Sequence, residues 1–156
     1  MNSIIENEFL GSQDLRDQLM DMLSDQDLSY KLTGSNPTLG ELCEEMGQIQ
    51  QIYTHSFKTL TLDWAYRGSN PDAANSVASL KTWYKTLDAE LYEVLSALSE
   101  DDVLNKHIDR GHGFTPSLYV QFQVYHEALL IFYAKASVYL KALNKQVTDE
   151  WRIGIG

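Results

Sequence analysis

Apolar residues recur every three or four positions along most of the chain, which is the spacing of helices that bury one face. The pattern predicts four helices, at about residues 3–23, 38–64, 75–98 and 115–144. No stretch alternates convincingly between apolar and polar residues, so no sheet is expected. The sequence therefore predicts an all-α fold, a four-helix bundle, in which residues 1–156 form a single domain.

Two of the predicted helices begin at residues suited to a helix start. Thr38 and Glu41 have the spacing of a capping box, and Thr115 followed by Pro116 suits an N-cap and a first helical position. The sequence of residues 23–28 is weakly similar to the sequence of residues 98–103. This similarity indicates either two helical hairpins of similar plan or two serines that each cap a short following turn.

The fourth predicted helix is apolar on two sides, which is typical of a helix that is covered all round. One stripe faces the expected core and consists of Leu118, Phe122, His126, Leu129, Tyr133, Ala136 and Leu140. The opposite stripe consists of Val120, Val124, Ile131 and Val138. A second copy of the chain would cover it, so we predict a homodimer. The alternative is that loops 24–37 and 99–114 cover it.

The net charge of −10 argues against nucleic-acid and anionic-membrane partners, because phosphate groups would be repelled. The only cysteine, Cys43, cannot form a disulfide within the chain, and the first residues have no signal-peptide pattern. We therefore expect a cytoplasmic protein. Nine tyrosines and three tryptophans indicate a cavity or an interface lined by aromatic rings.

Glu45 and His126 are the candidate metal ligands. His126 lies within the apolar stripe of its helix, and Glu45 lies at the flank of another, roughly 80° from the stripe centre. A carboxylate and an imidazole suit a divalent metal such as Zn or Ni. A third ligand would have to come from elsewhere, for example from Asp88, His107 or His112. The alternative is a core histidine that is hydrogen-bonded to Glu45 or to a tyrosine.

Other ionisable residues are weaker candidates. His55 falls on the outward side of its predicted helix and is expected at the surface. His107 and His112 lie in or beside a glycine-rich loop. Cys43 is followed by two glutamates, which would raise the pKa of its thiol and make it a poor nucleophile.

Two segments and a tryptophan resemble the DinB/YfiT-like superfamily. The segment Thr38-Leu39-Gly40-Glu41-Leu42-Cys43-Glu44-Glu45-Met46 is similar to its second-helix motif. The segment Ser137-Val138-Tyr139-Leu140-Lys141-Ala142-Leu143, following His126-Glu127, is similar to the end of its fourth helix, and Trp151 to a tryptophan near its C-terminus. The resemblance covers almost the whole chain.

This resemblance implies an up-down-down-up bundle, commonly a homodimer. It also implies a metal held by three histidines, one on the second helix and two spaced four apart on the fourth. Glu45 stands at the first of these positions. His126 is the only histidine of its helix, with Phe122 and Leu130 one turn to either side. The metal site therefore looks degenerate.

Three functions follow as hypotheses. The first is a DinB-like bundle that holds a small molecule in its cleft, with a degenerate metal site. The second is a metal-dependent thiol transferase or hydrolase that uses Glu45, His126 and a further ligand, as the resemblance implies for bacillithiol-, glutathione- or mycothiol-dependent relatives. The third is a structural or regulatory homodimer without catalysis.

Overall fold

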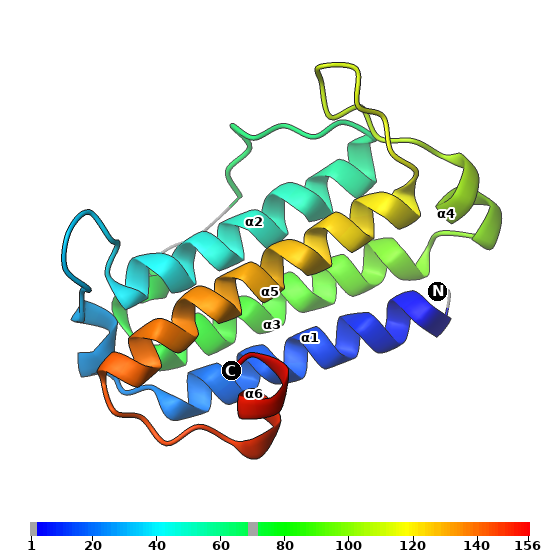
Figure 1. Ribbon diagram of the computed structural model, residues 1–156. Coiled ribbons are helices and arrows are strands. Elements are labelled where there is room, and N and C mark those ends of the chain that lie inside the picture. Colours follow the sequence, from blue (N-terminus) through cyan, green and yellow to red (C-terminus); the bar gives the residue numbers. More distant parts are fainter. Residues whose placement is uncertain (1–2, 69–71) are drawn as a thin grey trace.

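Four long helices lie side by side in the computed structural model, which describes residues 3–68 and 72–156 (Figure 1). α1 and α5 run in one direction and α2 and α3 in the other, so the bundle has the expected up-down-down-up order. The bounds of these helices are α1 Ser3–Met22, α2 Leu39–Thr59, α3 Val77–Ser96 and α5 Leu118–Ala142. Because α2 and α3 are parallel, the end of α2 and the start of α3 lie at opposite ends of the bundle.

Short helices occupy the connections and the C-terminal end. They are the 3-10 helices η1 (Asp25–Ser29) and η2 (Ala73–Asn75), and the α-helices α4 (Glu100–Asn105) and α6 (Asp149–Gly154). In the described part of the chain the only β-type pairing consists of isolated bridges, such as Thr61 with Asp109, so the prediction of no sheet is confirmed. No helix among the described residues is both long and apolar enough to cross a membrane.

The start of α2 is as predicted, but its end is not. The backbone N–H of Glu41 donates to Thr38 Oγ1 at 3.1 Å, and the Glu41 carboxylate accepts from the Thr38 N–H at 2.6 Å. The helix ends after Thr59, because Leu60 adopts a left-handed conformation with φ of 57°. The predicted extension to residue 64 was therefore wrong, since Leu62 N–H pairs with the Asp109 carbonyl instead.

The predicted start of the fourth helix was also wrong. Ser117 is the N-cap of α5, and its side chain accepts from the Val120 N–H. Pro116 stands before the helix, where its carbonyl accepts from the Ile108 N–H at 2.9 Å. This pairing with the preceding loop holds the Thr115–Pro116 pair outside the helix.

The similarity between residues 23–28 and 98–103 corresponds to two short capped helices. Ser99 and Asp102 exchange hydrogen bonds at 3.0 Å at the start of α4. At the start of η1, the Ser24 N–H donates to the Asp27 carboxylate at 2.7 Å. The hydrogen bonds that Asp102 accepts from Lys106 and Ser99 lower the pKa of its carboxyl to about 2. The interpretation that each serine caps a short following turn is therefore confirmed.

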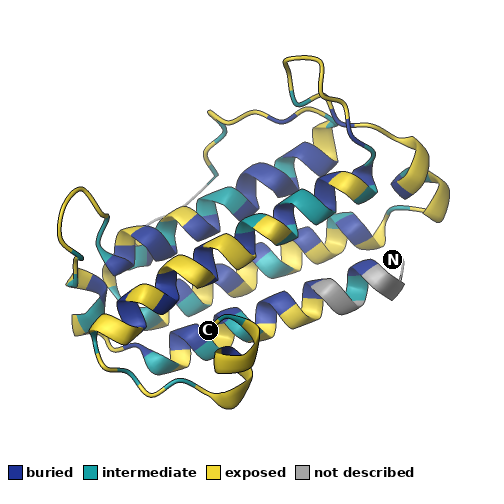
Figure 2. Ribbon diagram, viewed as in Figure 1, coloured by how far each residue is buried: buried dark blue, intermediate teal, exposed yellow. Residues whose placement is uncertain are grey.

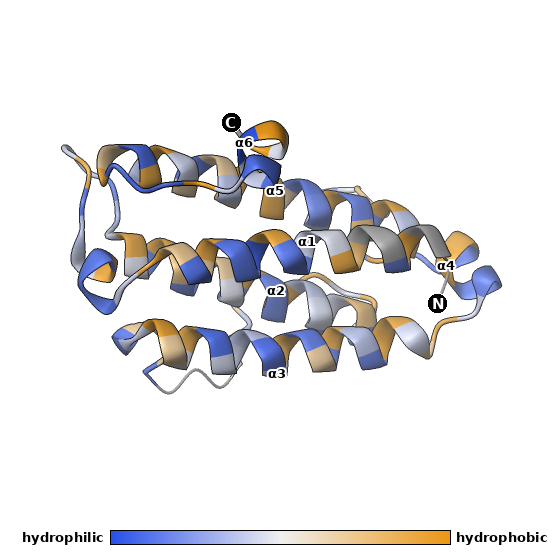
Figure 3. Ribbon diagram, turned by 90° about the horizontal axis from the view of Figure 1, so that it is seen from below, coloured by the Kyte–Doolittle hydropathy of each residue, from blue (hydrophilic) through white to orange (hydrophobic). Residues whose placement is uncertain are grey.

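The core runs along the bundle axis (Figure 2). Figure 3 shows hydrophilic and hydrophobic positions alternating around α1 and α3, as expected of helices with one buried face. α6 covers one side of the bundle with Trp151, which is fully buried and packs against Tyr133 with ring centroids 5.8 Å apart.

A buried polar network crosses the bundle from α1 to α3. The Arg16 guanidinium is completely buried and donates to Gln50 Oε1 at 2.6 Å and to Asp88 Oδ2 at 2.5 Å. Gln50 Nε2 donates to the other Asp88 oxygen at 2.9 Å, and the guanidinium lies 4.3 Å from the Tyr84 ring centre. Burial disfavours the charged arginine, but Asp88, Tyr133 and Tyr125 together outweigh this effect and the pKa of Arg16 is raised.

Candidate ligand pocket between α2 and α3

The two predicted metal ligands lie on different faces of the bundle. Glu45 is exposed on α2. His126 is half-buried on α5 and borders a small hollow formed with α1 and α6, whose other lining residues are Gly11, Ser12, Leu15, Glu150 and Gly154. The sequence pattern placed His126 near the centre of the core stripe, but the fully buried residue at this level is its neighbour Tyr125.

The register of α2 against α5 also separates the two residues. The helices are antiparallel, and Gln121 Nε2 on α5 donates to Ser56 Oγ on α2 at 2.9 Å. Glu45 lies eleven residues before Ser56, so it is level with Phe132, eleven residues after Gln121. Phe132 is six residues beyond His126, which is about 9 Å along the helix axis. The structure therefore does not bring Glu45 and His126 together.

The other suggested metal ligands are engaged elsewhere. Asp88 binds Arg16, His107 Nδ1 lies 2.9 Å from the Asn105 carbonyl, and His112 is exposed in the loop. Within residues 3–68 and 72–156 no three histidine, cysteine or acidic side chains are grouped closely enough to hold a metal ion. The residues present therefore do not fit the three-ligand site that the family resemblance implies.

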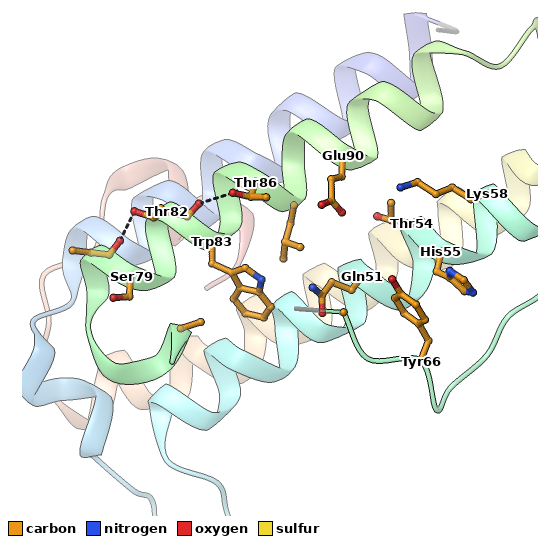
Figure 4. Close-up of a pocket in the computed structure, with 14 residues that line it drawn as sticks. Gln51, Thr54, His55, Lys58, Tyr66, Ser79, Thr82, Trp83, Thr86 and Glu90 are labelled. Atoms are coloured by element: carbon orange, nitrogen blue, oxygen red, sulfur yellow. Dashed lines mark hydrogen bonds between the residues drawn. The ribbon is translucent and has the colours of Figure 1, made fainter. Parts of the chain in front are cut away.

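A larger pocket of about 550 Å³ lies between α2 and α3 and beneath the segment that connects them. This volume falls within the usual range for small-molecule sites, roughly 300–1,000 Å³. α2 contributes Gln51, Thr54, His55 and Lys58 to its lining (Figure 4). α3 contributes a row of residues spaced four apart, Ala78, Thr82, Thr86 and Glu90, together with Ser79, Trp83 and Leu87.

Trp83 forms the wall of the pocket where α3 approaches α2 most closely. A Cβ atom at Gly47 of α2 would lie 2.2 Å from its ring, so the glycine is what allows this approach. The indole N–H of Trp83 is buried and has no acceptor among the described residues. A Cβ atom at Gly68 would likewise lie 2.4 Å from the Gln51 amide nitrogen, so a second glycine lets the connecting segment close over the pocket.

His55 stands at the mouth of the pocket rather than on an open surface. Its ring is half-buried and stacks on Tyr66, with centroids 3.9 Å apart and planes 7° from parallel. Tyr66 belongs to the segment that connects α2 to α3. The expectation of a plain surface histidine was wrong because the sequence did not indicate that this segment folds back over α2.

Lys58 and Glu90 bring opposite charges to one end of the pocket. They project from α2 and α3 respectively, and Figure 4 shows the lysine side chain extending toward Glu90. Both side chains are exposed to solvent. No ion pair joins them in the described part of the chain.

Cys43 takes no part in either hollow. It is buried, and burial raises the pKa of its thiol to about 12. The expected direction of the shift is thus confirmed, but its main cause is loss of solvent rather than the neighbouring glutamates.

Comparison with known proteins agrees with the architecture. The model of the DinB family matches residues 5–129, which is most of the chain. The chain belongs to the DinB family. A crystal structure of the DinB-like protein YjoA from Bacillus subtilis has the same fold, with a TM-score of 0.74 and 17% sequence identity over 94% of this chain and 96% of that one. The search of curated proteins found no match.

Membership of the DinB family confirms the resemblance, and the matched residues include the second-helix motif but not residues 137–143 or Trp151. The family match includes α2, α3 and Glu45, and it extends along α5 as far as Leu129. Because the sequence identity is only 17%, the similarity to YjoA supports the fold of this chain and no conclusion about its function. Any function of this DinB-family chain must therefore be argued from its own pocket and surfaces.

Proposed function

We propose that this DinB-family protein binds a small organic molecule in the pocket between α2 and α3. The observation that carries the proposal is the pocket itself. It has the volume of a small-molecule site, an aromatic wall at Trp83 and Tyr66, and a few charged groups at one end. An aromatic wall together with charged groups that can orient a ligand is a usual feature of small-molecule sites.

The proposal places function away from Glu45 and His126. Glu45 on α2 and His126 on α5 lie at different levels of the bundle and on different faces, so they offer no common point for one ligand. The α2–α3 pocket needs no metal ligand to explain its shape, because the small side chains of α3 account for the space.

Filling the pocket tests this proposal. Thr86 lines it from α3, so Thr86→Trp should occupy the space and abolish binding of compounds that recognise the wild-type protein. Ala89→Trp is the matched control, because Ala89 is exposed on the same helix and does not line the pocket. Binding would be measured by ligand-observed NMR with a library of small aromatic and aliphatic compounds.

The expected result is a set of compounds that bind the wild-type protein and Ala89→Trp equally and lose at least about tenfold in affinity for Thr86→Trp, a difference of about 1.4 kcal/mol. Equal binding to all three proteins would show that the compounds bind outside the α2–α3 pocket, which would contradict the proposal. A library with no binders would also contradict the proposal.

We also propose that the chain forms a homodimer through α5. Residues of its outer stripe are spaced alternately four and three apart, which is the spacing of a seam between paired helices. The stripe comprises Val120, Val124, Glu127, Ile131, Ala134 and Val138. Val120, Ile131 and Val138 are 40%, 56% and 52% exposed, so loops 24–37 and 99–114 do not cover these residues in the single chain.

Charges on this stripe favour a second copy of the chain as the partner. Glu127 and Lys135 lie four residues before and after Ile131, and both are exposed. In an antiparallel pair crossing at Ile131, the two-fold axis would set Glu127 against Lys135 of the partner subunit, and the reverse. The same surface is thus complementary to itself in charge.

A further inference from the structure

The charged end of the α2–α3 pocket has the geometry of a site for a molecule with two opposite charges. Gln50 of α2 bonds to Asp88 of α3, which sets the register of these parallel helices. On that register Lys58 is level with residue 96, six residues and about 9 Å beyond Glu90. Side chains on a helix lean toward its N-terminus, so the long lysine reaches back toward the carboxylate.

The space between the two charges opens onto the pocket. In Figure 4 the Glu90 carboxylate and the Lys58 ammonium approach from opposite helices, above the Thr54 side chain. A direct ion pair between two such exposed groups would contribute only about 0–1 kcal/mol. A ligand that carries both charges can occupy the space and contact both groups at once.

The rest of the pocket is suited to an uncharged, flat or branched group. Trp83 and Leu87 form the buried wall on α3, and Tyr66 closes the opposite side. Aromatic walls of this kind bind rings by offset or edge-to-face contact. The pocket therefore offers a charged end at Lys58 and Glu90 and an aromatic wall at Trp83, with Thr86 between Trp83 and Glu90 on α3.

We propose that the ligand is a zwitterionic amino acid with an aromatic or large apolar side chain. Its ammonium group contacts Glu90, its carboxylate contacts Lys58, and its side chain lies against Trp83. This inference rests on the proposed function and adds the chemical class of the ligand.

Three related compounds test the inference, with binding measured by titration calorimetry. L-tryptophan carries both charges, tryptamine lacks the carboxylate, and indolepropionate lacks the ammonium. L-tryptophan should bind the wild-type protein about tenfold more tightly than either analogue, because each analogue loses one hydrogen-bonded charge contact.

Two variants assign each charge to its partner. In Glu90→Gln, the preference for L-tryptophan over indolepropionate should disappear, while its preference over tryptamine remains. Lys58→Met should give the reverse pattern. Glu93→Gln and Lys85→Met change exposed residues of α3 that do not line the pocket, and they should keep the wild-type order.

The two proposals can fail separately. If L-tryptophan does not bind, but other compounds do and are lost in Thr86→Trp, the zwitterion inference is overturned and the pocket remains a binding site. Equal binding of L-tryptophan and either analogue to the wild-type protein, or variants that leave the order of affinities unchanged, would also overturn the inference. If no compound binds, both proposals fall.

Discussion

Asp88→Ala is expected to lower the free energy of unfolding by about 3 kcal/mol, as measured by urea denaturation. The variant removes the carboxylate that neutralises Arg16, a guanidinium with no solvent exposure. Leaving a buried charge unpaired costs about 3–5 kcal/mol. We expect the lower end of this range because the Asp88 side chain is itself 23% exposed, which lets water approach the arginine.

Asp17→Ala is the control for this prediction, because Asp17 is an exposed acid adjacent to Arg16 in sequence. It should change the free energy of unfolding by less than about 0.5 kcal/mol. The double variant Arg16→Met/Asp88→Leu should recover part of the stability lost in Asp88→Ala, because no charge remains buried. An Asp88→Ala protein as stable as Asp17→Ala would show that the network does not hold the bundle together.

Ile131→Glu is expected to convert a dimeric protein entirely into monomers. A dimer that crosses at Ile131 would bury two glutamates against each other in the variant, and a buried unpaired charge costs several kcal/mol. Light scattering coupled to size-exclusion chromatography should show the mass of two chains for the wild-type protein and of one chain for the variant. Leu104→Glu, which changes an exposed leucine on α4, should remain dimeric.

A charge reversal tests the orientation of the dimer. Glu127→Lys should weaken the dimer because it places like charges against Lys135 of the partner subunit, and Glu127→Lys/Lys135→Glu should restore it. A wild-type protein that is monomeric at every concentration tested would remove the dimer proposal, and an Ile131→Glu protein that stays dimeric would remove its placement on α5.

The long helices could be predicted from the sequence because their periodicity reports burial directly. The end of α2 and the start of α5 show where local signals stop being sufficient. The left-handed Leu60 accepts a hydrogen bond from Asp109, which is about 50 residues away. Pro116 accepts one from Ile108, which is eight residues away. Such tertiary contacts override local preferences for helix starts and ends, and one sequence does not reveal them.

The candidate pocket could not be predicted for a related reason. Its residues lie outside the apolar stripes, and the sequence does not say that α2 and α3 are neighbours at this level. One signal was present: Ala78, Thr82 and Thr86 form a row of small residues four apart, which leaves room beside a helix. Gly47 was a second signal, because a glycine inside a helix often marks a close approach.

His126 attracted attention because a histidine among apolar residues is uncommon and metal ligands are often histidines. The helical wheel placed His126 near the centre of the core stripe, but the residue is half-buried and borders a small hollow formed with α1 and α6. The family motif around Glu45 correctly indicated the fold. Among the described residues, no histidine, cysteine or acidic side chains are grouped closely enough with Glu45 or His126 to complete a ligand set.

The most direct test of the central claim is an amide chemical-shift map of the wild-type protein, titrated with the tightest-binding compound from the library. We predict that the shifted resonances will cluster on Gln51, His55, Trp83 and Glu90, together with the Trp83 indole N–H. Shifts that cluster around Glu45 or His126 instead, with the α2–α3 pocket unaffected, would contradict the account.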